Sequence, residues 1–460
     1  MLRSEDVYNW DRLPPDLKGM KASVLGMARS GMAAAQLLNE SGCHVLVSDS
    51  ADSASLKENA AVLENLGVDV ELSGHSDRVL QSDFIVRSPG IPRDIPILYE
   101  ARRRGILIVS ELEVAFWFNR ASVIAVTGSN GKTTTVEWLG DLFNRAGKKA
   151  FVCGNVGRSF SSIAAITAPD DIAVVEVSSF QLEDIVLFNP HIALITNFSP
   201  DHLDRYQSYE EYKRTKCRIF ANQHADDLLI YNRNDDDLAT YVTKVPGRKS
   251  SFGLDEPETP GIGLKDEDVI ISDASRQINL LNRKNLSLPG RHNLENALAV
   301  AYAAWSLGIA KEIIVESLKI FPGVPHRLEK VVERDGVLWI NDSKATNVAS
   351  GKVALESMHR PVILLAGGRD KGGAFSDIID TSADKIKQVI AFGEAGGTIE
   401  SAWNGHLPVM RVDSLAEAIT KADDIAESGD VVLLSPMCAS FDEFENYEQR
   451  GDYFRNRVIE

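Results

Sequence analysis

The hydrophobic pattern of the chain changes its period most clearly near residue 130. Residues 123–126 form an apolar run typical of a buried strand, and a glycine-containing loop follows at residues 128–131. Beyond the loop, apolar residues recur at helical spacing, at Val136, Leu139, Leu142 and Phe143. This pattern predicts a strand, a tight loop and a helix in direct succession.

Short apolar runs followed by polar or glycine-containing loops recur along much of the chain. The other runs are residues 22–25, 44–47, 83–87, 151–153, 172–177, 192–196, 337–341, 362–366, 389–392 and 431–434. With helical stretches between them, they indicate parallel sheets covered by helices. We therefore predict an α/β protein of three domains: a Rossmann-like domain at 1–112, a central P-loop ATPase-type domain at 113–322 and a Rossmann-like domain at 323–460.

The stretch Thr127-Gly-Ser-Asn-Gly-Lys-Thr-Thr134 has the sequence context of a phosphate-binding loop. Its glycines let backbone N–H groups turn toward an anion, and the following helix adds the positive end of its dipole. Lys132 would reach the β- and γ-phosphates, and a threonine hydroxyl would hold Mg²⁺. The loop is a shortened variant, since Val126 stands where the usual pattern has glycine. The alternative is a glycine turn before an ordinary helix with a solvated lysine.

Polar residues at other strand ends are candidates for the same site. Glu176 lies in an otherwise apolar run, where a carboxylate is costly unless it is paired or binds a metal. It is either a Mg²⁺ ligand or water-positioning residue, or one half of a structural ion pair. His202, just beyond residues 192–196, either contacts a metal or phosphate or is structural. The helix predicted at 209–220 carries Lys213 and Lys216, and the pattern does not choose between them.

Asn293 and Asn296 are spaced one helical turn apart, so both amides can face one ligand. An amide offers both a donor and an acceptor, which suits an adenine edge or phosphate oxygens.

The segment Gly26-Met-Ala-Arg-Ser-Gly31 is a degraded dinucleotide-binding fingerprint between two predicted strands. Asp49 lies roughly where an acidic residue would meet a ribose hydroxyl, and Ser88 follows a further strand toward the same crevice. Alanine in the middle position argues against close approach of a dinucleotide pyrophosphate. The open alternatives are another nucleotide diphosphate, NAD, and a purely structural turn; Ser88 itself is either a crevice residue or part of a plain turn.

Loops after the C-terminal strands present two lysines and two hydroxyls: Lys344, Lys371, Thr346 and Ser440. Such a set suits a small molecule bearing carboxylates. The alternative for each lysine is a solvated side chain in a glycine loop. Arg327, in the breaker-rich stretch 321–327, could return to a phosphate.

The amino-acid composition limits the classes of function that the chain can have. The chain has 66 acidic and 49 basic residues and a net charge of −17, which weighs against a general nucleic-acid binder. Its four cysteines lie far apart without a C-x-x-C pair, which suits reduced thiols in a cytosolic protein. We expect no signal peptide and no membrane span, since the N-terminus has no apolar stretch of that kind and no run reaches spanning length.

Taken together, the motifs resemble those of the Mur ligase family. The resemblance covers all three segments and is carried by Thr127-Gly-Ser-Asn-Gly-Lys-Thr-Thr134, Glu176-Val-Ser-Ser-Phe-Gln-Leu182, Asp201-His-Leu-Asp-Arg-Tyr206, His292-Asn-Leu-Glu-Asn296, Pro325-His-Arg327, Asn341-Asp-Ser-Lys-Ala-Thr-Asn347 and Ser435-Pro-Met-Cys-Ala-Ser-Phe-Asp442. The last two are similar to those of the D-glutamate-adding branch. The resemblance implies an ATP-dependent amide ligase of peptidoglycan precursor synthesis, which joins D-glutamate to UDP-N-acetylmuramoyl-L-alanine through an acyl phosphate.

The resemblance also implies roles for individual residues. The catalytic residues would be Lys132, Glu176, His202 and Lys216. ATP would be held by Gly128, Ser129, Asn130, Gly131, Lys132, Thr133, Thr134, Asn293, Asn296, Arg327 and Asp342. Two Mg²⁺ ions, with Mn²⁺ as a substitute, would be held by Thr133, Glu176, His202 and a carbamylated Lys216. The UDP-substrate would be held by Ser30, Asp49, Ser50, Ser88, Asn155 and Ser178. D-glutamate would be held by Lys344, Thr346, Lys371, Ser440 and Tyr447.

We expect a cytoplasmic monomer that binds no nucleic acid. Three other functions compete with the ligase: a folate-type polyglutamate ligase, a P-loop ATPase or nucleotide-regulated binding protein without ligation, and an NAD oxidoreductase. The first is disfavoured by the Ser435–Ser440 stretch, and the second because three segments each supply a ligand loop.

Overall fold

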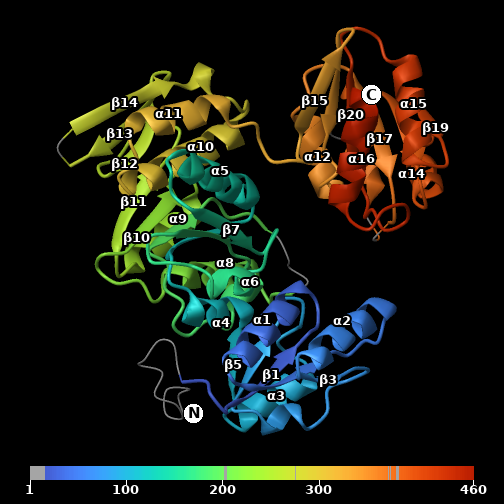
Figure 1. The fold of residues 1–460 in the computed structure, drawn as a ribbon. Helices are drawn as coiled ribbons and strands as arrows, with labels where there is room; N and C mark the ends of the chain where they lie inside the picture. Colours follow the sequence, from blue (N-terminus) through green and yellow to red (C-terminus); the bar gives the residue numbers. More distant parts are fainter. Residues whose placement is uncertain (1–15, 201–204, 275, 371, 373, 380–382) are drawn as a thin grey trace. The chain divides into compact units, whose positions relative to one another are not determined.

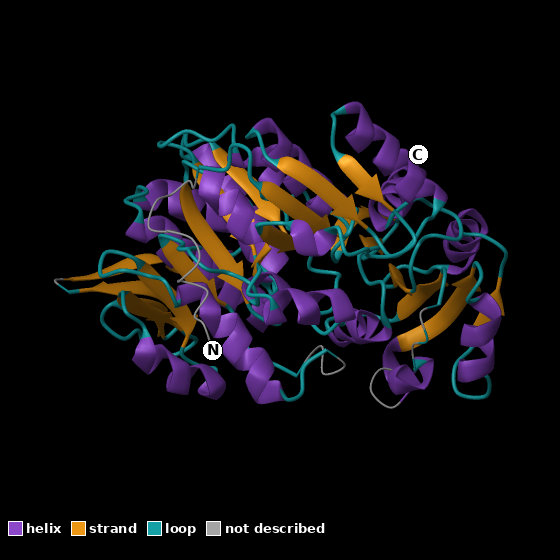
Figure 2. Ribbon diagram, turned by 90° about the horizontal axis from the view of Figure 1, so that it is seen from below, coloured by secondary structure: helices purple, strands orange, loops and turns teal. Residues whose placement is uncertain are grey.

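The computed structural model describes residues 16–200, 205–274, 276–370, 372, 374–379 and 383–460. The chain divides into two compact units, one ending at Phe321 and the other beginning at Pro322. The first unit contains two sheets and the second contains one (Figure 1), so the predicted α/β class is confirmed. Figure 2 shows helices flanking the strands. In the described part of the chain, no helix is long and apolar enough to cross a membrane.

The first sheet is five-stranded and parallel, in the order β3-β2-β1-β4-β5. This is the strand order of a Rossmann-like fold, as predicted. β4 is buried at every residue, as expected for a parallel strand covered on both faces. The elements are β1 (Lys21–Leu25), α1 (Arg29–Glu40), β2 (His44–Ser48), α2 (Ala54–Asn65), β3 (Asp69–Glu71), β4 (Phe84–Arg87), α3 (Pro96–Arg103) and β5 (Leu107–Ser110).

The second sheet has nine strands in the order β14-β13-β12-β11-β10-β9-β6-β8-β7. The strands from β12 to β7 are parallel, and β13 and β14 extend the sheet antiparallel. Its strands are β6 (Ser122–Thr127), β7 (Ala150–Gly154), β8 (Ile172–Glu176), β9 (Ile192–Ile195), β10 (Leu228–Asn232), β11 (Arg248–Phe252), β12 (Gly261–Lys265), β13 (Asp268–Asp273) and β14 (Arg276–Asn282). Its helices are α5 (Lys132–Arg145), α6 (Ser161–Ala164), α7 (Ser179–Leu182), α8 (Tyr209–Cys217), α9 (Asp236–Tyr241), α10 (Arg291–Ser306) and α11 (Lys311–Ile320).

Helix α4 (Glu111–Phe118) joins the first sheet to the second, and the expected boundary at residue 112 falls inside it. One apolar core runs from the first sheet through α4 into the second. Phe84 of β4 meets Trp117 of α4 edge-on, with ring centroids 5.6 Å apart. Phe116, on the same helix, meets Phe188 in the same way at 5.4 Å. The two sheets therefore belong to one packed unit.

The second unit has a six-stranded sheet in the order β15-β16-β20-β17-β18-β19. β15 pairs antiparallel with β16, and the other pairs are parallel. The strands are β15 (Glu329–Arg334), β16 (Val337–Asn341), β17 (Val362–Gly367), β18 (Ile386–Phe392), β19 (Val409–Arg411) and β20 (Val431–Met437). The helices are α12 (Val348–Glu356), α14 (Gly396–Trp403), α15 (Leu415–Ile425) and α16 (Tyr447–Ile459). This unit has the predicted Rossmann-like α/β character.

Candidate functional site

The loop at residues 128–131 follows β6, and its shape is fixed by residues that follow the neighbouring strand β9. Gly128 has φ +146°, and a Cβ there would lie 1.9 Å from Thr196 Oγ1, so only glycine fits. The Thr196 hydroxyl donates to the Asn130 carbonyl at 2.6 Å, and Asn197 Oδ1 accepts from the Asn130 amide at 3.0 Å. Neither Thr196 nor Asn197 was predicted as a site residue from the sequence, although both follow a buried strand. Gly131, at φ +82°, then starts α5.

Two lysines converge on this loop. Lys132 Nζ donates to the Gly128 and Ser129 carbonyls, both at 2.8 Å. Lys216 Nζ, on α8, donates to the same Gly128 carbonyl at 2.8 Å, and its residue is only 2% exposed. Lys213 instead pairs with Asp237, at 2.8 Å. The structure thus separates two lysines that the sequence pattern left equivalent, and brings Lys216 to the loop.

Glu176, the last residue of β8, contacts residues that follow the two neighbouring strands, β6 and β7. Its carboxylate accepts from Thr133 Oγ1 at 2.8 Å and from Asn155 Nδ2 at 2.9 Å, and the residue is 1% exposed. β8 lies between β6 and β7, so the three residues come from adjacent carboxyl ends of parallel strands. Arg29, from the first sheet's glycine turn, donates to the Asn155 carbonyl at 3.0 Å. Sequence analysis gave Arg29 no role.

The donor set around Glu176 fits a hard cation. A buried carboxylate and a threonine hydroxyl beside a phosphate-binding loop are oxygen ligands of the kind Mg²⁺ uses. Among the described residues, no group of three or more His, Cys, Asp or Glu side chains is placed to hold a metal. His202, predicted as a further ligand, lies outside the described residues.

The two asparagines of α10 have different partners. Asn296 Oδ1 accepts from Thr135 Oγ1 at 3.4 Å, and a Cβ on Gly131 would lie 2.4 Å from that oxygen. Asn296 therefore packs directly against the start of α5. Asn293 instead donates to the Pro289 carbonyl at 2.7 Å. Of the two asparagines, Asn296 is therefore the one that lies against the phosphate-binding loop.

Two of the predicted UDP-binding residues, Asp49 and Ser88, contact the glycine turn between β1 and α1. A Cβ on Gly31 would lie 1.8 Å from the Gly26 carbonyl oxygen, so the turn requires glycine there. Asp49 accepts from the Met27 amide at 2.8 Å, and Ser88 Oγ donates to the Gly26 carbonyl at 3.3 Å. These two side chains hold the turn in shape. Ser30, which is half-buried, and Ser50, which is exposed, lie beside it.

Ser178 caps α7, two residues beyond Glu176. Its hydroxyl accepts from the Gln181 amide at 3.4 Å, and the Gln181 side chain accepts from the Ser178 amide at 3.0 Å, which forms a capping box. The capped helix carries Glu183 and Asp184 directly after it, and both meet the buried Arg87 of β4. Arg87 was not predicted as a site residue, although it lies in an apolar run just as Glu176 does.

In the C-terminal unit, the loop after β16 is anchored by Asp342. Its carboxylate accepts from the Ser435 hydroxyl at 2.8 Å and from the Leu328 amide at 3.2 Å. Burial raises the pKa of Asp342 to about 7. The carboxylate therefore ties the start of the unit to the end of β20.

Asp342→Asn should change how stability depends on pH. A carboxyl whose pKa is raised from 3.8 to about 7 lets the folded state bind more protons, so stability falls as pH rises between these values. Once this carboxyl is fully ionised, the free energy of unfolding is lower by roughly 4 kcal/mol than when the carboxyl is protonated in both states. Asparagine does not titrate, so Asp342→Asn should gain stability relative to the unaltered chain between pH 5 and pH 8. Urea unfolding of both proteins at the two pH values measures this; a difference that stays constant contradicts the prediction.

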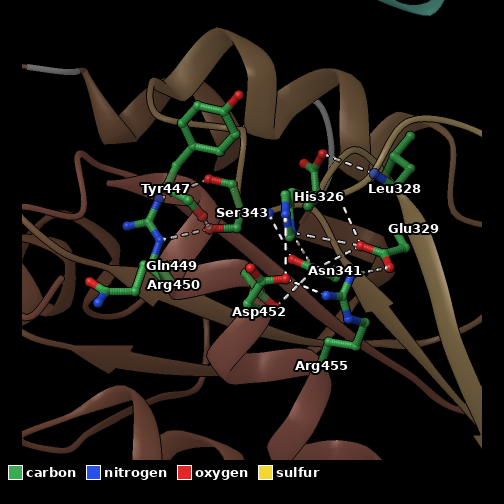
Figure 3. Close-up of polar contacts among 12 residues, drawn as sticks. His326, Leu328, Glu329, Asn341, Ser343, Tyr447, Gln449, Arg450, Asp452 and Arg455 are labelled. Carbon is green, nitrogen blue, oxygen red and sulfur yellow. Dashed lines mark hydrogen bonds and ion pairs between the residues drawn. The ribbon is translucent and has the colours of Figure 1, made fainter. Parts of the chain in front are cut away.

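A second polar network supports the same loop (Figure 3). His326, at φ +63° and 6% exposed, is 3.0 Å from Asn341 through Nδ1. Asn341 also donates to Glu329 at 3.0 Å and to the Gly451 carbonyl at 3.1 Å. The His326 carbonyl accepts from the Lys344 amide at 3.0 Å. The loop is thereby held from β15, β16 and α16 together.

Of the predicted amino-acid-binding residues, Lys344 and Tyr447 meet at the start of α16. Lys344 Nζ lies 5.8 Å from the centroid of the Tyr447 ring, a cation–π distance. The Tyr447 carbonyl accepts from Ser343 Oγ at 2.8 Å. Ser440 is buried, with its carbonyl accepting from the Phe444 amide at 2.8 Å. Thr346 and Arg327 are half-buried, and Lys371 lies outside the described residues.

Comparison with known proteins gives three matching family models. The Mur ligase MurD-like N-terminal domain matches residues 20–110, the Mur ligase middle domain matches 126–304, and the Mur ligase glutamate ligase domain matches 326–438. The matched ranges cover all three sheets in turn.

Individual relatives match almost the whole chain. The UDP-N-acetylmuramoylalanine–D-glutamate ligase of Salinibacter ruber is 41% identical over 456 residues, covering 97% of this chain and 99% of the relative. The protein of the same name from Chlorobium phaeobacteroides is 41% identical over 457 residues, covering 96% and 98%. The solved structure of the UDP-N-acetylmuramate–alanine ligase MurC of Thermotoga maritima has 19% identity and a TM-score of 0.58, covering 96% of this chain and 99% of that chain, which is a likeness of fold.

Proposed function

Because this chain belongs to the Mur ligase family, we propose that it joins D-glutamate to UDP-N-acetylmuramoyl-L-alanine with consumption of ATP. The observation that carries the proposal is the 41% identity to a ligase of that name over nearly the full length of both chains. The enzyme then acts in peptidoglycan precursor synthesis. The three sheets divide the substrates: the UDP-sugar on residues 1–112, ATP on 113–322 and D-glutamate on 323–460.

The chemistry suits the residues that meet at the phosphate-binding loop. A carboxylate is a poor electrophile until it carries phosphate as a leaving group, so the substrate carboxylate is first phosphorylated. Transfer of a phosphoryl group depends mainly on positioning and on cations that stabilise negative charge. Lys132 supplies a cation at the loop, and Asn296 packs against the helix that follows. The D-glutamate amine then displaces phosphate from the acyl group.

Mg²⁺ fits the oxygen donors of Thr133 and Glu176, which lie 2.8 Å apart. We propose that these two, with His202 and a carbamylated Lys216, hold two such ions, and that Mn²⁺ substitutes for them. When bound, the ions neutralise charge on the phosphates. Glu176 also fixes Asn155, which presents its amide beside the same carboxylate.

The proposal is tested by release of phosphate from ATP. Release should depend jointly on UDP-N-acetylmuramoyl-L-alanine and D-glutamate, and the amino acid should be consumed in equal amount. Release from ATP alone would instead indicate a P-loop ATPase, and activity with a folate substrate would indicate a polyglutamate-type ligase. L-glutamate in place of D-glutamate serves as the matched control for the amino-acid site.

Lys216→Ala should lower turnover about 10²-fold, since it removes the buried amine that lies against the phosphate-binding loop at the Gly128 carbonyl. If the lysine carries a carbamate, a small added carboxylate such as acetate should restore part of the activity. Lys213→Ala is the control, because that lysine pairs with Asp237 and should need no rescue. Failure of rescue, with an unmodified lysine mass for the native protein, argues against carbamylation.

We also propose that the enzyme works as a monomer in the cytoplasm. All four cysteines are unpaired and buried, which is consistent with a reducing compartment. Sedimentation at micromolar concentration tests the oligomeric state.

A further inference from the structure

Arg87 lies at the end of β4, directly before Ser88. Its side chain is 1% exposed, in a position where an unpaired guanidinium would be strongly unfavourable. The guanidinium makes four hydrogen bonds, two of them to carboxylates: Nε donates to Asp184 at 2.5 Å and Nη2 donates to Glu183 at 2.7 Å. Both carboxylates are themselves buried, with side chains 9% and 4% exposed. This is a charge cluster closed off from solvent between the two sheets of the first unit.

The remaining two contacts define what the cluster connects. Nη1 donates to the Ile91 carbonyl at 2.6 Å, which lies in the turn that begins at Ser88. Nη2 also donates to the Phe180 carbonyl at 3.1 Å, inside α7. One guanidinium therefore binds the Ser88 turn on one side and the α7 segment on the other. A planar group with a fixed fork of donors holds such a geometry more tightly than a lysine would.

The α7 segment is the continuation of β8, the strand that ends at Glu176. Ser178 caps α7 two residues after Glu176, and residues 183–184 follow the helix, so only a short stretch of chain joins the segment to the Glu176 strand end. On the other side of the cluster, Ser88, which begins the turn that contains Ile91, donates to the Gly26 carbonyl in the glycine turn of the first sheet. The cluster thus connects the Ser88 turn with the segment that follows Glu176, in addition to the contact of Arg29 with the Asn155 carbonyl.

We propose that Arg87 is a positioning residue that sets the distance between the Ser88 turn, which holds the UDP end of the substrate, and the Glu176 strand end, where its carboxylate is phosphorylated. This role rests on the proposed function. The UDP-sugar spans both places, so its reacting carboxylate is aligned only if the two are fixed relative to each other. Arg87 itself touches neither substrate nor reacting atoms.

Arg218 offers a matched control. It donates to the Leu182 carbonyl at 2.7 Å and to the Ile185 carbonyl at 2.9 Å, so it also holds the α7 segment. It does so from the end of α8, and its side-chain hydrogen bonds in the described structure go to the α7 segment alone. Loss of Arg218 therefore loosens the same segment without separating the segment from the first sheet.

The test compares Arg87→Met, Arg87→Lys and Arg218→Met with the unaltered chain. Arg87→Met should lower kcat/KM for UDP-N-acetylmuramoyl-L-alanine on the order of 10-fold, with KM for ATP within about 2-fold. Arg87→Lys should recover part of the loss. Arg218→Met should leave KM for the UDP-sugar unchanged. Normal kcat/KM in Arg87→Met, or an equal rise of the UDP-sugar KM in Arg218→Met, overturns the proposal.

Two further measurements keep the test decisive. If Arg87→Met fails to fold, the triple variant Arg87→Met/Glu183→Gln/Asp184→Asn removes the unpaired charges and should show the same kinetic loss. Amide hydrogen exchange needs no turnover: Arg87→Met should speed exchange in residues 88–91 and 179–186, and Arg218→Met only in 179–186. If the unaltered chain has no ligase activity, the proposed function is wrong, and the exchange experiment still tests Arg87. If amide exchange at residues 88–91 is the same in Arg87→Met as in the unaltered chain, the role proposed for Arg87 is wrong.

Discussion

Replacing Lys132 by alanine should lower turnover about 10³-fold, the upper part of the range seen when one preorganised donor to a developing charge is removed. The lysine ammonium lies over the loop, 2.8 Å from two of its carbonyl oxygens, and is therefore held ready beside the start of α5. Alanine leaves the loop glycines and the helix start in place, so the loss reflects the missing charge. Initial rates of phosphate release at saturating substrates measure the effect.

Lys148→Ala is the control for Lys132→Ala. Lys148 lies just beyond the C-terminal end of the same helix, α5, and is exposed. Its removal changes the net charge of the chain equally and should leave turnover within about 2-fold, as for most surface substitutions. Near-normal activity of Lys132→Ala would rule out the role assigned to the loop.

Glu176→Gln should also lower turnover about 10³-fold and raise the Mg²⁺ concentration needed for half-maximal rate. Glutamine has nearly the same size and keeps one oxygen to accept from Thr133 or Asn155. What it loses is the negative charge and one of two acceptors. A plot of rate against Mg²⁺ concentration separates weaker metal binding from a lower maximal rate.

Asp171→Asn serves as the control for Glu176→Gln. Asp171 lies directly before the other end of β8, is also buried, and accepts from the Ala168 amide at 2.9 Å. Its neutralisation can lower stability but should leave the Mg²⁺ requirement unchanged. A Glu176→Gln protein with the normal Mg²⁺ requirement and normal turnover would contradict the metal assignment.

The local parts of the fold and site were predictable because each depends on residues that are close together in the sequence. The strand, loop and helix at 122–145 follow from an apolar run, glycines and a change of period, and the structure has them as β6, the loop and α5. Glu176 was selected because a charge in a buried strand needs a partner. In the structure the buried carboxylate accepts from Thr133, and its role as a Mg²⁺ ligand stays a prediction.

The parts that could not be predicted depend on pairings between distant residues. Lys213 and Lys216 lie one turn apart on a helix, and only the tertiary structure shows which one reaches the Gly128 carbonyl. Arg87 and Asp184 are 97 residues apart, and no local period connects them. Asp49 was expected to meet a ribose, yet in the structure its carboxylate also holds the Met27 amide. Such contacts follow from how the sheets pack.

The contacts of Glu113, on α4, limit where this chain can be cut into fragments. Its buried carboxylate accepts from the backbone amides of Val186, Leu187 and Phe188, at 2.8 to 2.9 Å. A fragment starting after α4 would remove the acceptor of these three amides and expose the apolar surface that α4 covers. A cut at residue 112 would also divide the helix itself. The chain divides into two compact units between Phe321 and Pro322, so we expect fragments cut there to keep the contacts of α4 with both sheets.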